Sequence, residues 1–312
     1  MAIQIQHIGL SAIIVDAGRR GVLHQGFCQS GPMDARAFEL ANRLCGQTNA
    51  PTVEIMGECT LFVEQDCYLS VTGPAATLLI DNQQTDCWQR FAVNANSIVH
   101  IRPERLGTRH YVAVPSGFAV DAIVGSASTV KRENMGGLHK DGSSIRVGDT
   151  LNVKAISAGL SLNSPASLPA HLIPKYDSPA LIGIVPGYQH QAFSTLTWRR
   201  LLSSEYDVTP QMDRMGVRLK GPEVKSIVST LYSEAIAAGS VQVPPDGQPI
   251  VMMADRQTLG GYPKMGAVAR CDLYRFAQCL PGDKIQFYQL DAANARATWL
   301  LQQSSIARWF GN

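Results

Sequence analysis

The sequence lacks any block of like charges and any long apolar run. Its 27 Lys and Arg residues nearly balance its 25 Asp and Glu residues, which leaves a formal net charge of +2. Binding to nucleic acid through the phosphates usually needs a concentrated basic surface, and a membrane-spanning helix needs about 20 consecutive apolar residues. We therefore expect neither nucleic acid nor a membrane as a partner.

The sequence also lacks the cysteine and histidine spacing of a metal site. Its seven cysteines are odd in number and include no C-x-x-C pair, and its seven histidines are scattered. Such cysteines are typical of reduced, buried apolar side chains, and no metal is expected. The first residues, Met1–His7, show neither the charged region nor the apolar core of a signal peptide, so we expect a cytoplasmic protein.

Three motifs that would mark a nucleotide site or a serine nucleophile are absent. No G-x-G-x-x-G follows a strand and opens a helix, and no G-x-S-x-G elbow is present. The segment Gly125-Ser-Ala-Ser-Thr129 offers hydroxyls and backbone N–H groups that could line an anion site. It lacks the Gly-Lys-Ser/Thr ending of a phosphate-binding loop, so it does not indicate that this chain alone binds ATP.

What the sequence does contain is a pattern of short strands. Between Val53 and Ile101, short apolar runs are separated by turn residues at intervals of about ten, which is typical of a β-barrel or a sandwich. A chain of 312 residues is also long for one domain. We expect a first domain over residues 1–155, a linker rich in Ser, Ala and Pro over 156–179, a second domain over 180–290 and a C-terminal helix over 291–312.

Helices are expected to be few. The clearest lies over Met33–Cys45, where apolar residues recur at helical spacing and Gly46 ends the pattern. The two halves of the chain also match faintly at an offset of about 180 positions, which places Met33-Asp34 on Met212-Asp213. This match suggests duplicated β domains.

The stretch Ala254–Lys264 is the richest in chemistry. It follows a predicted buried strand, Gln248–Met253, and Gly260-Gly261 within it allows a close backbone approach to a ligand. An ordinary glycine-rich turn carries the same residue types, so a solvated turn remains an alternative. The polar side chains of the stretch are Asp255, Arg256, Gln257, Thr258, Tyr262 and Lys264.

Two of these side chains are the first candidates for catalysis. A carboxylate at Asp255 beside an ammonium at Lys264 could orient a water molecule and stabilise an oxyanion, although the two could also form a surface ion pair. Arg256 could hold a carboxylate or a phosphate, or form an internal salt bridge.

Several ordered motifs over almost the whole chain resemble one family. These motifs are Asp16-Ala-Gly-Arg19, Ser30-Gly-Pro-Met-Asp34, Leu40-Ala-Asn42, Gly136-Gly-Leu138, Ser233-Glu234, Val241-Gln-Val-Pro244, Ala254-Asp-Arg-Gln257, Gly260-Gly-Tyr-Pro-Lys264 and Pro281-Gly-Asp283. Together they resemble the allophanate hydrolase subunit 2-like proteins, also called the biotin-dependent carboxyltransferase family, which includes the C component of bacterial 5-oxoprolinase. The resemblance implies a mainly β fold of two cyclophilin-like β-barrel domains with a few short helices and a C-terminal helix.

The resemblance also implies partners and a reaction. A subunit of a 5-oxoprolinase would work with a subunit 1-type (B) protein and a third (A) subunit, and the complex would use ATP to hydrolyse 5-oxo-L-proline to L-glutamate. The alternative is a carboxyltransferase component that acts on urea-like amides with biotin. A third possibility, of another class, is a regulatory protein that binds a kinase-inhibitor-like subunit.

The resemblance and the residue types together select the site residues that we test against the structure. Asp255, Lys264 and Tyr262 are the catalytic candidates. The candidates for binding the small-molecule substrate are Arg256, Gln257, Thr258, Gly260, Gly261, Asp213, Arg214, Asp34 and His24. Asp34 and Asp213 could instead cap turns, and His24 could be structural.

Overall fold

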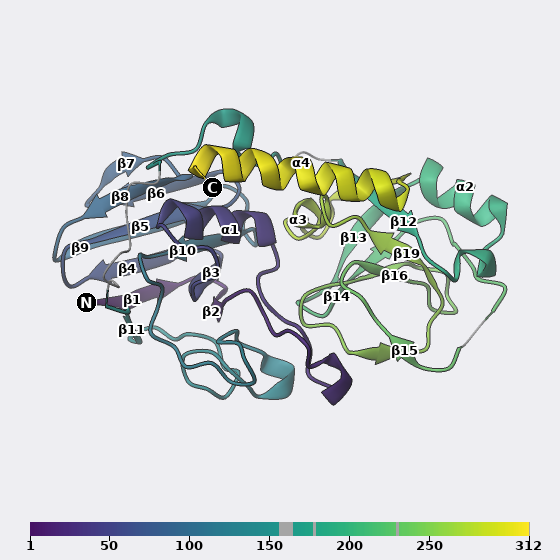
Figure 1. Ribbon diagram of the computed structural model, residues 1–312, viewed down its shortest axis with the longest axis horizontal. Coiled ribbons are helices and arrows are strands. Elements are labelled where there is room, and N and C mark those ends of the chain that lie inside the picture. Colours follow the sequence, from purple (N-terminus) through teal and green to yellow (C-terminus); the bar gives the residue numbers. More distant parts are fainter. Residues whose placement is uncertain (156–164, 177–178, 229–230, 312) are drawn as a thin grey trace. The chain divides into compact units, whose positions relative to one another are not determined.

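The computed structural model describes residues 1–155, 165–176, 179–228 and 231–311. The chain divides into two compact units, drawn in Figure 1. The first unit consists of Met1–Arg20, Ser30–Pro174 and Ile306–Asn312, and the second of Gly21–Gln29 and Lys175–Ser305. Part of the expected linker, residues 156–164 and 177–178, lies outside the described residues, so the domain boundaries that we expect from the sequence stay a prediction.

The first unit is built from two antiparallel sheets. One has six strands in the order β11-β1-β4-β9-β6-β7, and the other has five in the order β2-β3-β10-β5-β8. The strands are β1 (Ala2–Ile8), β2 (Ser11–Val15), β3 (Thr52–Met56), β4 (Cys59–Val63), β5 (Cys67–Thr72), β6 (Ala76–Ile80), β7 (Gln83–Thr85), β8 (Gln89–Val93), β9 (Ser97–Pro103), β10 (Arg109–Ala113) and β11 (Thr150–Asn152). Alternate residues of these strands face a shared apolar core that draws on both sheets, for example Ile3, Leu61 and Val99 from one and Ile55, Leu69 and Val112 from the other.

The second unit contains a closed barrel of seven strands in the order β12-β19-β16-β17-β14-β13-β20. The barrel closes through a parallel pairing of β12 with β20, and a separate two-stranded sheet joins β15 to β18. The strands are β12 (Ala180–Pro186), β13 (Glu205–Met212), β14 (Gly216–Lys220), β15 (Glu234–Ala235), β16 (Ser240–Gln242), β17 (Ile250–Met252), β18 (Leu259–Gly260), β19 (Lys264–Val268) and β20 (Lys284–Gln289).

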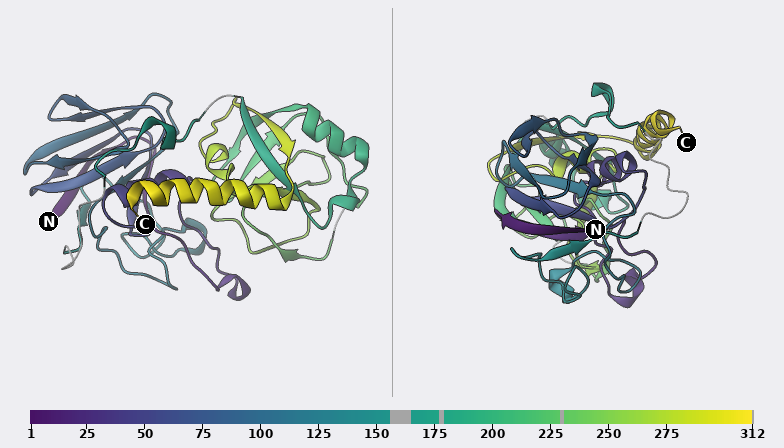
Figure 2. Two further views of the ribbon diagram at one scale, coloured as in Figure 1. Left: turned by 45° about the horizontal axis from the view of Figure 1, so that its top comes forward. Right: turned by 90° about the vertical axis from the view of Figure 1, so that its left-hand side faces the viewer.

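The described residues form four α-helices besides the strands. Figure 2 draws the chain from two further directions. The helices are α1 (Ala35–Leu44), α2 (Thr195–Ser203), α3 (Leu273–Phe276) and the long α4 (Ala292–Phe310), and single 3-10 turns form at η1 (Leu23–Gln25), η2 (Lys131–Glu133), η3 (Ala170–Leu172) and η4 (His190–Ala192). The expectation of a mainly β fold with a few short helices and a C-terminal helix is confirmed. In the described part of the chain, no helix is both long enough and apolar enough to cross a membrane.

Helix α1 begins where the sequence predicts a helix. Asp34 caps it, because its Oδ1 accepts hydrogen bonds from the backbone N–H groups of Arg36 and Ala37 at 3.1 and 2.9 Å. The buried face of the helix includes Phe38 and Leu44. The faint repeat between the two halves does not extend to this element, since the chain that follows Asp213 enters strand β14 instead of a helix.

The first unit contains a buried histidine that makes its stability depend on pH. His110 lies in β10, and burial lowers the pKa of its imidazole to about 4, although its Nε2 donates a hydrogen bond to the Pro74 carbonyl oxygen at 3.0 Å. Between pH 6.5 and 4 the unfolded chain binds a proton that the folded chain rejects. The free energy of unfolding should therefore fall by roughly 3 kcal/mol from this residue as the pH drops through that window.

Replacing His110 with Gln should remove this contribution while keeping an N–H donor for the Pro74 carbonyl. Denaturant unfolding between about pH 7.5 and 4 should show a steeper loss of stability in the parent protein than in the variant. His24→Gln is the control, because His24 is exposed. Parallel pH profiles for the parent protein and His110→Gln would contradict the prediction.

Candidate functional site

Lys264 is the first residue of strand β19, and its side chain is nearly enclosed. Its ammonium Nζ lies 2.5 Å from the Glu234 Oε1, and its backbone N–H donates to the Gln189 Oε1 at 2.8 Å. Only 6% of Lys264 is exposed. A buried ammonium that is paired and hydrogen-bonded keeps its charge at a fixed position, which is what a catalytic or binding cation requires.

Glu234 is the carboxylate of this pair, and it comes from the small sheet beside the barrel. It lies in β15 directly opposite Gly260 of β18. Burial acts to raise the pKa of Glu234. Hydrogen bonds from Lys264, Tyr188 and Gln189, together with the positive charge of Lys264, outweigh this effect, so the pKa of Glu234 is lowered. Glu234 is therefore a carboxylate at neutral pH.

Tyr188 completes the carboxylate's surroundings. The pKa of the Tyr188 hydroxyl is raised to about 12, mainly by loss of hydration and also by the hydrogen bond to Glu234 and the negative charge of Glu234. This holds although 71% of Tyr188 is exposed. The hydroxyl therefore keeps its proton and remains a hydrogen-bond donor at neutral pH.

Next to Lys264, Gln242 adds an amide donor without a partner in the described part of the chain. It lies in β16 directly opposite Lys264, only 2% of it is exposed, and its Nε2 has no hydrogen-bond partner among the residues that the structure describes. Gly260 packs closely on this amide, because a Cβ there would lie 3.0 Å from the Gln242 Nε2 and 2.7 Å from the Ile236 Cδ1. A side chain at position 260 would therefore require these two side-chain ends to shift.

We call Tyr188, Gln189, Glu234, Gln242 and Lys264 the Lys264 cluster. It combines a fixed cation, an ionised carboxylate, a phenol and an amide donor without a partner among the described residues. A buried donor left unpaired costs free energy, on the order of 1–3 kcal/mol. Natural structures tolerate this cost most readily where a ligand supplies the missing acceptor.

The structure gives different ion-pair partners to the two residues that the sequence suggested as a catalytic pair. The Nε and Nη2 atoms of Arg214 donate to the Oδ2 and Oδ1 atoms of Asp255 at 2.8 and 3.1 Å. This bidentate pair links the loop after β17 to the turn between β13 and β14. Lys264 is paired with Glu234 instead, so within the described residues the structure shows no ion pair between Asp255 and Lys264. A catalytic role for Asp255 stays a prediction.

Arg256 is bound within the second unit. Its Nε donates to the Ile236 carbonyl at 2.9 Å and its Nη1 to the Met253 carbonyl at 3.3 Å, while its Nη2 lies 3.4 Å from the Gln29 Oε1. Burial lowers the pKa of its guanidinium. These contacts hold the loop against the segment after β15, so a bidentate grip on a substrate anion would require Arg256 to give them up.

The remaining predicted residues of this stretch lie in strand β18 or next to it in the sequence, and they are not members of the Lys264 cluster. Gln257, Thr258, Gly260 and Gly261 are half-buried or exposed only in part, and the Thr258 and Gly261 carbonyls accept hydrogen bonds from Ile236 and Leu231. Tyr262 is 42% exposed. The expected turn thus contains strand β18, whose backbone supports the segment that carries Glu234.

Three further candidates have local structural roles. The Asp213 Oδ1 accepts from the backbone N–H groups of Met215 and Gly216, which caps the turn before β14. Asp34 caps α1 in the first unit, as described above. His24 is exposed in the short turn η1, and its Nε2 lies 3.4 Å from the Gln25 Nε2.

The loop Gly125–Thr129 proves to bind a carboxylate of the protein itself. The Asp16 Oδ1 accepts from the hydroxyls of Ser126 and Ser128 at 2.5 and 2.7 Å, and its Oδ2 accepts from the Ala127 N–H at 2.7 Å. This loop therefore does not fit a nucleotide phosphate, because Asp16 already fills its donors.

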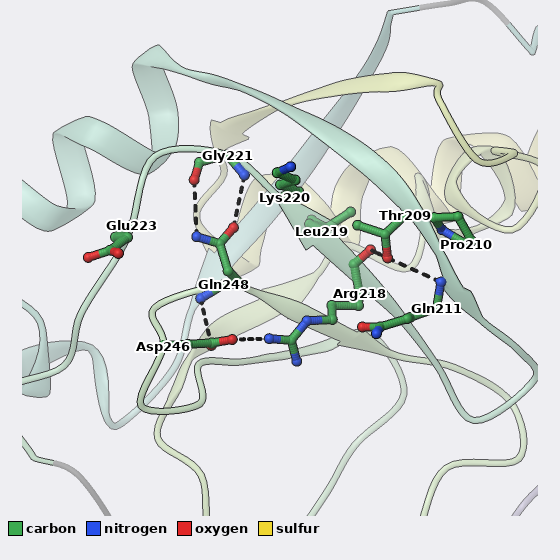
Figure 3. Close-up of a pocket in the computed structure, with 10 residues that line it drawn as sticks. All are labelled: Thr209, Pro210, Gln211, Arg218, Leu219, Lys220, Gly221, Glu223, Asp246 and Gln248. Atoms are coloured by element: carbon green, nitrogen blue, oxygen red, sulfur yellow. Dashed lines mark hydrogen bonds and ion pairs between the residues drawn. The ribbon is translucent and has the colours of Figure 1, made fainter.

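A surface hollow of about 650 Å³ lies over the β13–β14 hairpin (Figure 3). Its polar groups satisfy one another: the Gln248 side chain exchanges two hydrogen bonds with the Gly221 backbone, and Arg218 pairs with Asp246. Thr209 Oγ1 donates to the Arg218 carbonyl at 2.8 Å. Figure 3 shows these side chains pointing toward each other, so the Lys264 cluster is the better candidate for a site.

Sequence reasoning selected Lys264 and Gly260 but missed four members of the cluster. Glu234 and Gln242 stood only among the motifs that carry the family resemblance, and Tyr188 and Gln189 were not selected. One available signal was the placement of Gln242 between two valines, Val241 and Val243. A polar residue at a buried strand position needs a partner or a function.

Comparison with known proteins agrees on one family. A family model described as carboxyltransferase domain, subdomain A and B, matches residues 25–289. The protein named as the C component of 5-oxoprolinase in Haemophilus influenzae is 34% identical over 289 residues, which cover 91% of this chain and 90% of that protein. The protein of the same name in Escherichia coli is 31% identical over 304 residues, which cover 94% of this chain and 93% of that protein.

A solved structure shares the fold of this chain. The crystal structure of the Kluyveromyces lactis urea amidolyase superposes on 99% of this chain with a TM-score of 0.92 and 26% identity. The matched part is 20% of that protein's chain. The residues matched by the family model include parts of both units and the whole Lys264 cluster, and the chain therefore belongs to the family of carboxyltransferase domains with subdomains A and B.

Proposed function

We propose that this chain is a subunit of an ATP-dependent 5-oxoprolinase, which hydrolyses 5-oxo-L-proline to L-glutamate together with a subunit 1-type (B) protein and a third (A) subunit. The observation that carries the proposal is the match, over 91% and 94% of this chain, to two bacterial proteins that are named as the C component of 5-oxoprolinase. The sequence identity to these two proteins is 34% and 31%, whereas the identity to the urea amidolyase is 26%. The higher identity favours the assignment to a 5-oxoprolinase.

The Lys264 cluster supports this reading chemically. The substrate is a small lactam, so a site for it needs donors for the amide oxygen and an acceptor for the amide N–H. Lys264 and Gln242, opposite each other on neighbouring strands, supply the donors. Glu234 supplies the acceptor. Donors that are fixed before the reaction stabilise the negative charge that develops on a carbonyl oxygen as water attacks.

A second candidate function uses the same groups. A carboxyltransferase component that acts on a urea-like amide would also need donors for a carbonyl oxygen and an acceptor for N–H. The superposition on urea amidolyase over 99% of this chain favours that alternative. Biotin would then be the carboxyl carrier, and no 5-oxoproline would be consumed.

We assign the use of ATP to the whole complex. Within the described residues, the loop that the sequence suggested for an anion is filled by Asp16. We therefore derive no step of the reaction through ATP on this chain.

The deciding experiment combines this chain with its A and B partners and measures glutamate formation from 5-oxo-L-proline with and without ATP. ATP-dependent glutamate formation is the expected result. A stable complex that yields no glutamate but carboxylates urea with biotin would favour the second function. A complex with the B-type protein that shows neither reaction would favour a regulatory role.

Removing either charge of the Lys264–Glu234 pair should stop turnover. Lys264→Met and Glu234→Gln keep the side-chain volume but remove the fixed cation or the ionised acceptor, and we expect kcat/KM to fall by about 100-fold or more. Arg218→Met is the matched control, because it breaks the Arg218–Asp246 ion pair elsewhere in the same unit. Equal activities of Lys264→Met and Arg218→Met, with the complex intact by size-exclusion chromatography, would rule out the site.

The unpaired amide of Gln242 gives a second prediction. Gln242→Met removes the donor and keeps the length of the side chain, so the free energy of unfolding should stay the same or rise by about 1 kcal/mol. Activity of the complex should fall by about 10-fold or more. Calorimetry and the glutamate assay on the same preparations check both parts. A destabilised variant with normal activity would show that Gln242 is only a packing residue.

A further inference from the structure

A second group without a partner lies in the first unit, outside the Lys264 cluster. Arg19 is only 1% exposed, and none of its three guanidinium nitrogens has a hydrogen-bond partner among the described residues. These nitrogens are also closed to bulk solvent. An uncompensated buried charge is among the most unfavourable features that a fold can carry.

The carboxylate nearest to Arg19 in the sequence is committed elsewhere. Asp16 accepts from the hydroxyls of Ser126 and Ser128, from the Ala127 N–H and from the Gly18 N–H at 2.9 Å. Three of these donors bind the Oδ1 atom and one binds the Oδ2 atom. Arg19 therefore follows a turn in which the carboxylate of Asp16 is bonded to the turn itself and to the Ser126–Ser128 segment.

Ser30 adds a second unpaired donor from a neighbouring segment. Its Oγ is buried without a partner in the described part of the chain, and its φ is 55°, in the left-handed region that non-glycine residues seldom adopt. The next residue, Gly31, packs on the Arg19 turn, because a Cβ there would lie 3.3 Å from both the Asp16 carbonyl oxygen and the Gly18 nitrogen. Strain at a buried polar residue is typical of functional positions.

We propose that Arg19 and Ser30 form a binding site for an anionic oxygen group, either a carboxylate or a phosphate. The guanidinium presents parallel N–H groups that match two oxygens of such a group, and the Ser30 hydroxyl adds a third donor from the adjoining segment. Because the donors are closed to solvent, the anion enters only when the chain over them opens. The site stands independently of the proposed function, since none of its residues belongs to the Lys264 cluster.

Binding is measured on the isolated full-length chain by calorimetry and thermal unfolding. The probes are inorganic phosphate and 5-oxo-L-proline, with sodium chloride at matched ionic strength as the blank. At least one probe should raise the Tm of the parent protein in a saturable way. A response to phosphate alone identifies a phosphate site. A response to 5-oxo-L-proline identifies a carboxylate site at Arg19 only where Arg19→Met weakens it, because the proposed function also places this compound at the Lys264 cluster.

The variant Arg19→Met separates ligand binding from a structural role. Removing an uncompensated buried charge should leave the Tm without ligand unchanged or higher, and should weaken binding of the responding probe by about 10-fold or more. Arg20→Met is the matched control, because Arg20 is exposed, adjacent and of equal charge. It should bind as the parent protein does. Arg19→Lys keeps the positive charge but lacks the parallel N–H groups of a guanidinium, so it should bind the responding probe with intermediate affinity.

Two results would overturn the proposal. One is a parent protein whose Tm responds to neither probe beyond the salt blank. The other is a lower Tm of the Arg19→Met variant together with a parental Tm and parental affinity of the Arg19→Lys variant. Such a pattern would show that the positive charge at position 19 serves folding alone.

Discussion

Closure of the seven-stranded barrel is the constraint on which the candidate site depends. The parallel pairing of β12 with β20 completes the ring, and the antiparallel pairing of β16 with β19 inside it places Gln242 opposite Lys264. Side chains opposite each other in a ladder lie about 5 Å apart. The distance between the two donors is thus set by backbone hydrogen bonds, which makes it resistant to local side-chain changes.

The small β15–β18 sheet supplies the opposite charge. Glu234 pairs with Gly260 in the ladder, and Gly260 in turn packs closely on the Gln242 amide. The glycine therefore acts through the absence of a side chain, since its own φ is not in the left-handed region. The ion pair with Lys264 then connects this sheet to the barrel.

Two of the buried polar groups without partners in the described residues are nitrogen donors of long side chains. An amide at Gln242 and a guanidinium at Arg19 are buried without acceptors within the described residues. Their surroundings are well satisfied; for example, Asp16 receives four hydrogen bonds. Buried donors that remain unpaired inside an otherwise satisfied fold are where ligands gain most by binding.

The sequence by itself determined the mainly β architecture, the position of α1 and the family. Strand spacing and helix caps depend on neighbours within a few residues, so local patterns are sufficient for them. It also selected Lys264 and Gly260, because both lie in a polar, glycine-rich stretch after a buried strand. Asp255 was selected on the same ground, and its proximity to Lys264 in sequence suggested a pair.

Only the tertiary structure decided which charges meet. Lys264 pairs with Glu234, 30 positions away, and Asp255 pairs with Arg214, 41 positions away. Side chains on consecutive segments of a barrel point in directions that the strand register sets, and that register depends on long-range backbone pairing. The sequence did not show that the Gln242 amide lacks a hydrogen-bond partner within the described residues. A donor without a partner can be recognised only once every possible partner has been placed.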